Sequence, residues 1–294
     1  METAYFNGSF LPKENIRISP DDRGFLFGDG IYEVMKWYGG FFFDPESHLA
    51  RLKRSLREVR INWPEADTFL TFAKELIKIN RLEDQYALIY LQVTRGAAPR
   101  NHSFPDPEVQ PTSYAFVRET GHTKKEPGPG VGVILRKDIR WNRCDIKSVS
   151  LLANTLSFQE AHERGMKECI FVREGMITEG ARSNIFIVAG GELCTHPESE
   201  YILSGVTRKN IIRFAKESGI VVKEVPFPEK DLRTIQEAFI TNTSAEVTPV
   251  IGFESIRVGN GMPGPVTLQI HKKFLDEIID LKGQNPLTPP TSPT

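Results

Sequence analysis

The alternation of hydrophobic and polar residues predicts a mixed α/β first part of the chain. Asn7-Gly8 is typical of a two-residue hairpin turn, and Gly39-Gly40 indicates a second turn. Two later segments repeat hydrophobic residues at helical spacing, and Asp67 is a plausible N-cap for the second of them. The predicted elements are a hairpin at 5–10, apolar segments at 34–38 and 41–43, helices at 48–61 and 67–82, and strands at 86–94 and 113–117.

A polar stretch rich in proline and glycine, residues 119–130, interrupts these patterns and is typical of a linker. We therefore expect a small N-terminal α/β domain at 1–118, a larger domain at 131–282 and a disordered tail at 283–294. The larger domain is predicted to contain helices at 148–164, 207–218 and 267–281, and strands at 131–136, 168–172, 184–188, 221–225 and 238–241.

Composition excludes several classes of protein. The 294 residues carry 37 basic and 38 acidic side chains, so nothing favours nucleic acid or an anionic membrane as a partner. No apolar run is long enough for a membrane helix, and the N-terminus lacks the regions of a signal peptide. The three cysteines, Cys144, Cys169 and Cys194, suggest neither a disulfide framework nor a metal site. We expect a cytoplasmic protein.

Lys147 lies between a predicted strand and a predicted helix, where rigid elements can hold it partly away from water. Desolvation lowers the pKa of an amine, and a neutral amine can attack a carbonyl to form a Schiff base. Taken alone, a lysine near a helix start is more often a solvated surface charge.

Two loops could hold an anion. The segment 204–208 leads directly into an amphipathic helix, whose first N–H groups and dipole favour a phosphate, although Ser204 or Thr207 could simply cap the helix. The polar loop 241–246 follows an apolar strand and could add donors, or be an ordinary turn. Neither loop is a Walker A sequence, and no GxGxxG motif is present, which disfavours a nicotinamide cofactor.

Glu179 stands beside a turn of small residues that precedes an apolar strand. A carboxylate in this position could approach a flat ligand and keep a pyridine nitrogen protonated, or it could be a solvated side chain in a hairpin.

Taken together, these segments resemble the class IV aminotransferases, the pyridoxal 5'-phosphate (PLP) enzymes of fold type IV. The resemblance extends from about residue 5 to residue 281, and within the family it is strongest to the D-amino-acid aminotransferases. It implies a two-domain α/β (α+β) fold with a small N-terminal domain and a larger C-terminal domain with a β-barrel-like core. The motifs are DRGFLFGDGIYE at 22–33, HLARL at 48–52, RCDIKS at 143–148, TEG at 178–180, GVTR at 205–208 and TNTS at 241–244.

The resemblance implies a role for each matched residue. Lys147 would form the Schiff base with PLP and move the substrate proton, Glu179 would bind the pyridine nitrogen, and Tyr32 would lie near Lys147 and the substrate. The phosphate would be bound by Arg51, Val206, Thr207 and Thr243, and the cofactor ring would pack against Leu203.

The loop at 94–105 resembles the loop of the D-specific subfamily. In that subfamily an arginine and a histidine reach across a dimer interface and bind the substrate α-carboxylate, and Arg100 and His102 occupy those positions. We therefore expect a homodimer in which this loop selects chirality by orienting the substrate. Arg182 departs from the small residues usual at its position. We expect it to bind a second carboxylate; the alternatives are that it replaces part of the α-carboxylate clamp or points toward solvent.

The sequence thus predicts a D-amino-acid transaminase that transfers an amino group to a 2-oxo acid such as 2-oxoglutarate or pyruvate, by a ping-pong mechanism and without a metal. The alternatives are a branched-chain L-amino-acid aminotransferase, an aminodeoxychorismate lyase and a catalytically silent PLP-binding protein. The Arg100/His102 loop argues against the first two, and the occupied catalytic positions argue against the third.

Overall fold

The computed structural model describes residues 2–123 and 125–284, which form two compact units. Of the described residues, the first unit contains 2–122, Ile146–Ser150 and 277–284, and the second contains 123, 125–145 and Leu151–Asp276. Lys147 therefore belongs to the first unit although it follows the predicted linker. The domain boundaries given by the sequence remain a prediction.

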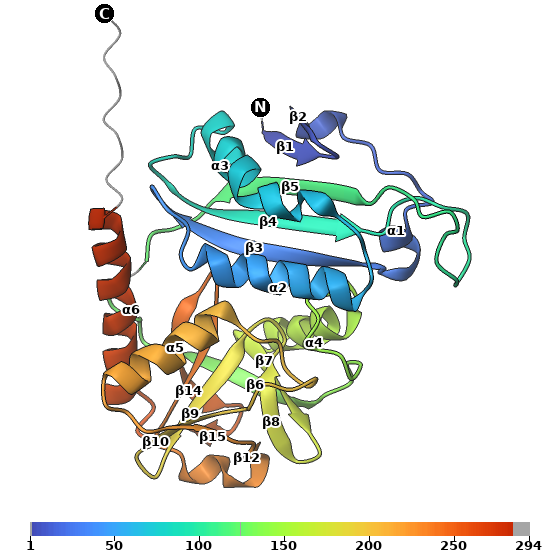
Figure 1. The fold of residues 1–294 in the computed structure, drawn as a ribbon. Helices are drawn as coiled ribbons and strands as arrows, with labels where there is room; N and C mark the ends of the chain where they lie inside the picture. Colours follow the sequence, from blue (N-terminus) through green and yellow to red (C-terminus); the bar gives the residue numbers. More distant parts are fainter. Residues whose placement is uncertain (1, 124, 285–294) are drawn as a thin grey trace, which may run out of the picture. The chain divides into compact units, whose positions relative to one another are not determined.

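The first unit is built on an antiparallel sheet with strand order β2-β1-β5-β4-β3. Helices α2 and α3 pack against this sheet (Figure 1), and Met35, Leu52, Phe69 and Leu91 are among the side chains that form the core beneath them. The elements are β1 (Thr3–Phe6), β2 (Ser9–Pro12), η1 (Lys13–Asn15), α1 (Arg23–Phe27), β3 (Gly30–Tyr38), α2 (Pro45–Glu58), η2 (Pro64–Thr68), α3 (Phe69–Ile79), β4 (Tyr86–Thr94) and β5 (Thr112–Glu119).

The structure confirms most predicted elements of this unit. The hairpin β1–β2 turns at Asn7 and Gly8, whose φ angles of 45° and 88° lie in the left-handed region that an Asn-Gly turn requires. The assignment of Asp67 as an N-cap is wrong, because Asp67 lies inside η2 and its carboxylate pairs with Lys53 instead. Residues 41–43 make only an isolated bridge to Trp37 and form no strand.

The second unit is built on a curled, half-barrel sheet with strand order β11-β10-β9-β13-β14-β6-β7-β8-β12, and β15 pairs with β14. An apolar cluster that includes Val133, Ile187, Ile240 and Phe253 forms one core of this unit. The elements are β6 (Val131–Lys137), α4 (Leu152–Glu163), β7 (Glu168–Arg173), β8 (Met176–Gly180), β9 (Asn184–Ala189), β10 (Glu192–Thr195), α5 (Val206–Glu217), β11 (Val222–Glu224), β12 (Phe227–Pro228), η3 (Glu229–Thr234), β13 (Glu237–Asn242), β14 (Glu246–Phe253), β15 (Ile256–Arg257) and α6 (Pro265–Gln284).

The helix predicted at 148–164 begins four residues later than expected. Residues 147–149 instead continue a β-type ladder: the N–H of Tyr32 donates to the carbonyl of Lys147 (2.9 Å), and the N–H of Val149 donates to the carbonyl of Gly30 (3.1 Å). These bonds hold the backbone extended, so α4 starts only at Leu152. The last helix extends to Gln284, and residues 285–294 of the predicted tail lie outside the described residues.

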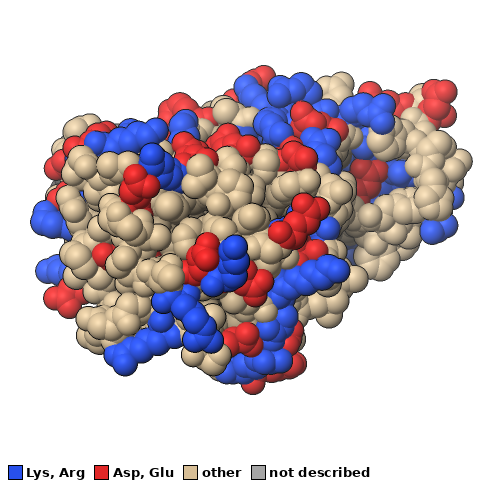
Figure 2. All heavy atoms as spheres, turned by 90° about the horizontal axis from the view of Figure 1, so that it is seen from below, with Lys and Arg blue, Asp and Glu red and all other residues tan. Residues whose placement is uncertain are grey.

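Charge is evenly distributed on the visible surface. Acidic and basic side chains are interspersed on the face in Figure 2, which has no extended patch of a single sign. Among the described residues, no helix is both long and apolar enough to cross a membrane.

Candidate active site

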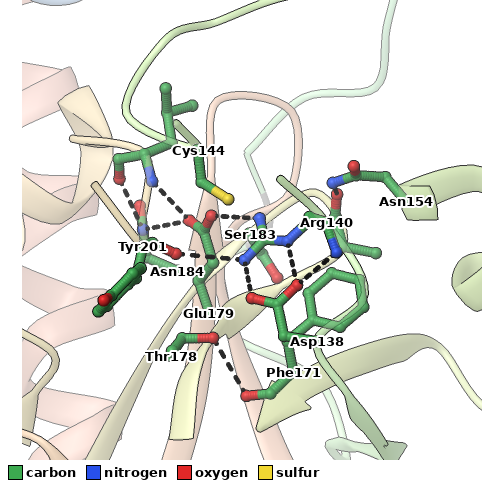
Figure 3. Close-up of polar contacts among 12 residues, drawn as sticks. Asp138, Arg140, Cys144, Asn154, Phe171, Thr178, Glu179, Ser183, Asn184 and Tyr201 are labelled. Carbon is green, nitrogen blue, oxygen red and sulfur yellow. Dashed lines mark hydrogen bonds and ion pairs between the residues drawn. The ribbon is translucent and has the colours of Figure 1, made fainter. Parts of the chain in front are cut away.

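Glu179 is buried at the end of β8, and both of its carboxylate oxygens accept hydrogen bonds (Figure 3). Oε1 accepts from Nη1 of Arg140 at 2.6 Å. Oε2 accepts from Nδ2 of Asn184 at 3.1 Å and from the backbone N–H of Leu203 at 3.0 Å. The carboxylate is therefore fixed by three separate segments of the second unit.

Burial raises the pKa of Glu179 to about 7, against the opposing effect of the Arg140 guanidinium and of the donated hydrogen bonds. Nearby Asp138 also raises this pKa through charge repulsion. A carboxyl group that titrates near neutrality would bind a cationic ring nitrogen strongly, since the pair favours the ionised forms of both groups.

Arg140 and Asp138 are members of this site that the sequence reasoning missed. They lie just after β6, and Asp138 accepts from Nε and Nη2 of Arg140, both at 3.0 Å. Asp138 also pairs with Arg173 at 3.0 Å. The only signal in the sequence was a cluster of charged residues at 136–140, which is also typical of a solvated strand end.

Lys147 lies beside β3, the edge strand of the sheet in the first unit. Its Nζ is 4.3 Å from the centre of the Tyr32 ring, and its backbone N–H donates to Oγ of Ser55 at 3.3 Å. The structure therefore brings Lys147 and Tyr32 together, as the resemblance implies. Both side chains are half-buried, so the amine is held against an aromatic face without being sealed from ligands.

Arg51, on α2, is part of a buried cluster with Glu33 and His48. Its Nη2 donates to Oε1 of Glu33 at 2.6 Å and its Nε donates to Oε2 at 3.0 Å, a bidentate pair. His48 contacts the same carboxylate through Nδ1 at 3.0 Å. Although burial opposes ionisation of Glu33, the charge of Arg51 and the contact with His48 leave its pKa well below the usual range. Glu33 and His48 thus fix the direction of the Arg51 guanidinium.

The start of α5 has the geometry of an anion site. Its N-cap is Gly205, which supplies no side-chain cap, while Val206 and Thr207 of the first turn are buried. A Cβ on Gly205 would lie only 2.0 Å from Oδ1 of Asn184, so glycine is required for this close approach. Thr243 lies in the turn after β13 and is half-buried.

A further hydroxyl of this region was missed by the sequence reasoning. Thr241 is buried, and its Oγ1 has no hydrogen-bond partner among the described residues. It stands opposite Asn184 in the antiparallel pair β9–β13, so both side chains project from the same face of the sheet. A buried hydroxyl without a partner is costly, which fits a polar ligand on this face.

Arg100 and His102 lie on an exposed loop of the first unit, and the ring of Phe27 contacts both of them. Arg23 holds the loop backbone, because its Nη1 donates to the carbonyls of Asn101 (2.6 Å) and Ser103 (3.3 Å). The two candidate side chains thus project from a backbone that is anchored on each side of His102.

Arg182 follows β8 and is largely exposed. Its Nε lies 3.9 Å from Oε2 of buried Glu168, and its guanidinium carbon lies 4.2 Å from the centre of the Phe158 ring. These two contacts orient the guanidinium while its Nη groups have no partner among the described residues. Burial raises the pKa of Glu168 above its usual range.

Comparison with known proteins identifies the class of enzyme. The pattern of the amino-transferase class IV family matches residues 30–253, and the chain belongs to this family. D-alanine aminotransferase of Staphylococcus haemolyticus is 39% identical over 275 residues, which cover 93% of this chain and 97% of that protein. D-alanine aminotransferase of Bacillus licheniformis is 37% identical, with 93% and 96% covered.

A solved structure confirms the fold. The branched-chain amino acid aminotransferase of Escherichia coli superposes with a TM-score of 0.85 at 26% identity, covering 94% of this chain and 94% of that chain. The predicted α/β fold of type IV is therefore confirmed, as is the predicted family. The protein is an aminotransferase.

Proposed function

We propose that the protein is a PLP-dependent D-amino-acid transaminase that transfers the amino group of a D-amino acid to 2-oxoglutarate or pyruvate. The observation that carries this proposal is the similarity to D-alanine aminotransferases over 93% of the chain. It is supported by the anchored Arg100/His102 loop, whose guanidinium and imidazole suit a carboxylate.

The described residues fit PLP. The buried carboxylate matches a ring nitrogen, and the amine beside an aromatic ring matches an aldehyde. The oriented arginine and the uncapped helix start both match a phosphate. We assign Lys147 to the aldehyde, Glu179 to the ring nitrogen and Leu203 to the ring face. Phosphate binding is assigned to Arg51, Thr207, Thr243 and the N–H of Val206.

When bound, PLP supplies an aldehyde that condenses with amines and a ring that withdraws electrons from the substrate α carbon. Nζ of Lys147 is the base that would move the proton between the substrate α carbon and the 4′ carbon of the cofactor. Glu179 keeps the ring nitrogen protonated, and Tyr32 holds Nζ of Lys147 in reach of the substrate.

Stereochemistry follows from where the α-carboxylate is held. We propose that the protein is a homodimer and that Arg100 and His102 of one subunit bind the substrate carboxylate in the site of the other. Their exposure in the single chain is consistent with this role. Fixing the carboxylate determines which face of the α carbon meets Lys147.

Arg182 is proposed to bind the side-chain carboxylate of dicarboxylic substrates such as D-glutamate, D-aspartate and 2-oxoglutarate. Its guanidinium is already oriented by Glu168 and Phe158. Arg182→Ser should lower the rate with D-glutamate at least about tenfold relative to D-alanine, the loss of one charge-assisted pair. Unchanged relative rates for the two donors would contradict this role.

A branched-chain L-amino-acid aminotransferase is the second candidate, because the superposed Escherichia coli enzyme has branched-chain amino acids in its name. The 26% identity to that enzyme is well below the 39% identity to a D-alanine aminotransferase, which favours the D-amino-acid assignment. An aminodeoxychorismate lyase or a silent PLP-binding protein has no comparable support.

We also propose that the protein works in the cytoplasm. Its three cysteines are free and buried, which suits a reducing compartment.

Product analysis tests the proposed function. The PLP-loaded protein should convert D-alanine and 2-oxoglutarate to pyruvate and D-glutamate, and Lys147→Ala should abolish this conversion. Pyruvate formation with equal rates from L-alanine, or its persistence in Lys147→Ala, would contradict the proposal.

A further inference from the structure

Arg140 makes contacts along every edge of its guanidinium. Nε and Nη2 donate to Asp138, Nη1 donates to Glu179, and Nη2 also reaches the carbonyl of Tyr201 at 3.2 Å. The guanidinium carbon lies 4.4 Å from the centre of the Phe171 ring. Such a set of contacts leaves one orientation, so Arg140 is a rigid donor rather than a mobile counter-ion.

The two carboxylate oxygens of Glu179 accept different numbers of hydrogen bonds. A carboxylate oxygen can accept two hydrogen bonds. Oε2 already accepts two, from Asn184 and Leu203, whereas Oε1 accepts one among the described residues, from Arg140. Oε1 therefore has room for one further donor, and its direction is set by the bond from Arg140 (Figure 3).

We propose that Arg140 is a positioning residue of the active site: it orients the buried Glu179 side chain, favours its carboxylate form and leaves one acceptor site on Oε1 for a ring N–H donor. The donor is the pyridine nitrogen of PLP, so this inference rests on the proposed function. Arg140 acts only through Glu179 and through no contact of its own with substrate.

The charges that face Glu179 act in opposite directions. Arg140 favours the carboxylate, whereas Asp138 disfavours it, and Asp138 is in turn held by Arg173. Cys144, whose thiol pKa is itself raised by burial to about 11, stays neutral at physiological pH and adds no charge. Removing Arg140 or Asp138 should therefore shift the titration of Glu179 in opposite directions, which general damage to the fold would not do.

The titration can be measured without PLP. In cofactor-free protein, the infrared absorption of a protonated carboxyl group is followed against pH, and Glu179→Gln identifies the contribution of Glu179. The midpoint in the unaltered protein should lie at about 7. Arg140→Gln should raise this midpoint by about one pH unit or more, and Asp138→Asn should lower it. Arg140→Lys should keep the midpoint close to that of the unaltered protein.

PLP affinity provides the second readout. Loss of the Glu179 carboxylate should weaken PLP binding, so Arg140→Gln should raise the Kd about tenfold at neutral pH and less above the new midpoint. Arg140→Lys should bind PLP almost as well as the unaltered protein.

An unchanged midpoint in Arg140→Gln, or a shift in the same direction in Arg140→Gln and Asp138→Asn, would overturn the proposal. If Arg140→Gln does not fold, Asp138→Asn alone decides, because a raised or unmoved midpoint contradicts the inference. If the unaltered protein binds no PLP, the proposed function fails while the infrared titration still tests the role of Arg140.

Discussion

The buried carboxyl of Glu179 makes the stability of the cofactor-free protein depend on pH. Its folded-state pKa of about 7 lies above the ordinary value of 4.5, so the folded state binds a proton more tightly than the unfolded chain. The contribution to stability is complete below pH 4.5 and is lost as the pH rises toward 7. A shift of this size corresponds to roughly 3 kcal/mol.

We therefore predict that the difference in unfolding free energy between the cofactor-free protein and Glu179→Gln varies with pH. The variant should gain about 2.5 kcal/mol relative to the unaltered protein between pH 5 and pH 8, because it has no carboxylate to bury. Urea unfolding at the two pH values measures this difference. A difference that does not vary with pH would contradict the shifted pKa.

Single residues of the site differed in how far the sequence revealed them. Lys147 and Glu179 stand in motifs, so they could be proposed from the amino-acid sequence alone. Arg140 could not, because its bond to Glu179 joins positions 39 residues apart, on a loop after β6 and at the end of β8. Contacts between distant segments leave no local pattern in one sequence.

Among the elements, α2 supplies Arg51 to the proposed phosphate site, and Arg51 is held in a buried pair with Glu33 of β3. Removing one partner of such a pair leaves an uncompensated buried charge. Glu33→Gln should lower the unfolding free energy by about 3–5 kcal/mol, as measured in urea.

The matched control is the partner of another cation on the same helix. Lys53 pairs with Asp67, and both side chains are well exposed to solvent. Asp67→Asn should cost less than about 1 kcal/mol, since water screens exposed pairs. Equal losses in Glu33→Gln and Asp67→Asn would show that burial of the Arg51 pair does not matter.

The elements that the sequence predicted are those with regular patterns or a distinctive turn, such as the β1–β2 hairpin and the amphipathic α3 and α5. Strands β8, β10 and β14 were not predicted. β8 contains Glu179 and Gly180, β10 has only four residues, and β14 contains Pro249. Their membership in the sheet depends on pairing with neighbours rather than on local propensity.

At the scale of the whole molecule, the proposed homodimer can be tested by mixing inactive subunits. Lys147→Ala lacks the proposed base, and the double variant Arg100→Ala, His102→Ala lacks the proposed hydrogen-bond donors to the substrate carboxylate. A mixed dimer has one site with Lys147 from one subunit and the intact loop from the other. Random exchange should restore up to about a quarter of full activity with D-alanine, because half the dimers are mixed and each has one complete site.

No restoration after verified subunit exchange would mean that the loop serves its own subunit. A control mixture of Lys147→Ala with Glu179→Ala should regain nothing if Lys147 and Glu179 serve the same site within one chain, because the mixed dimer then has no complete pair.

The family and the α/β fold could be predicted because motifs along nearly the whole chain occur in one order. We propose that the Arg100/His102 loop determines the choice of D- over L-amino acids. The most direct measurement follows the visible absorbance of the PLP-loaded protein as single amino acids are added without an acceptor. D-Alanine and D-glutamate should remove the band, and L-leucine and L-valine should leave it. Loss of the band with L-leucine or L-valine, but not with the D-amino acids, would contradict the proposed preference for D-amino acids.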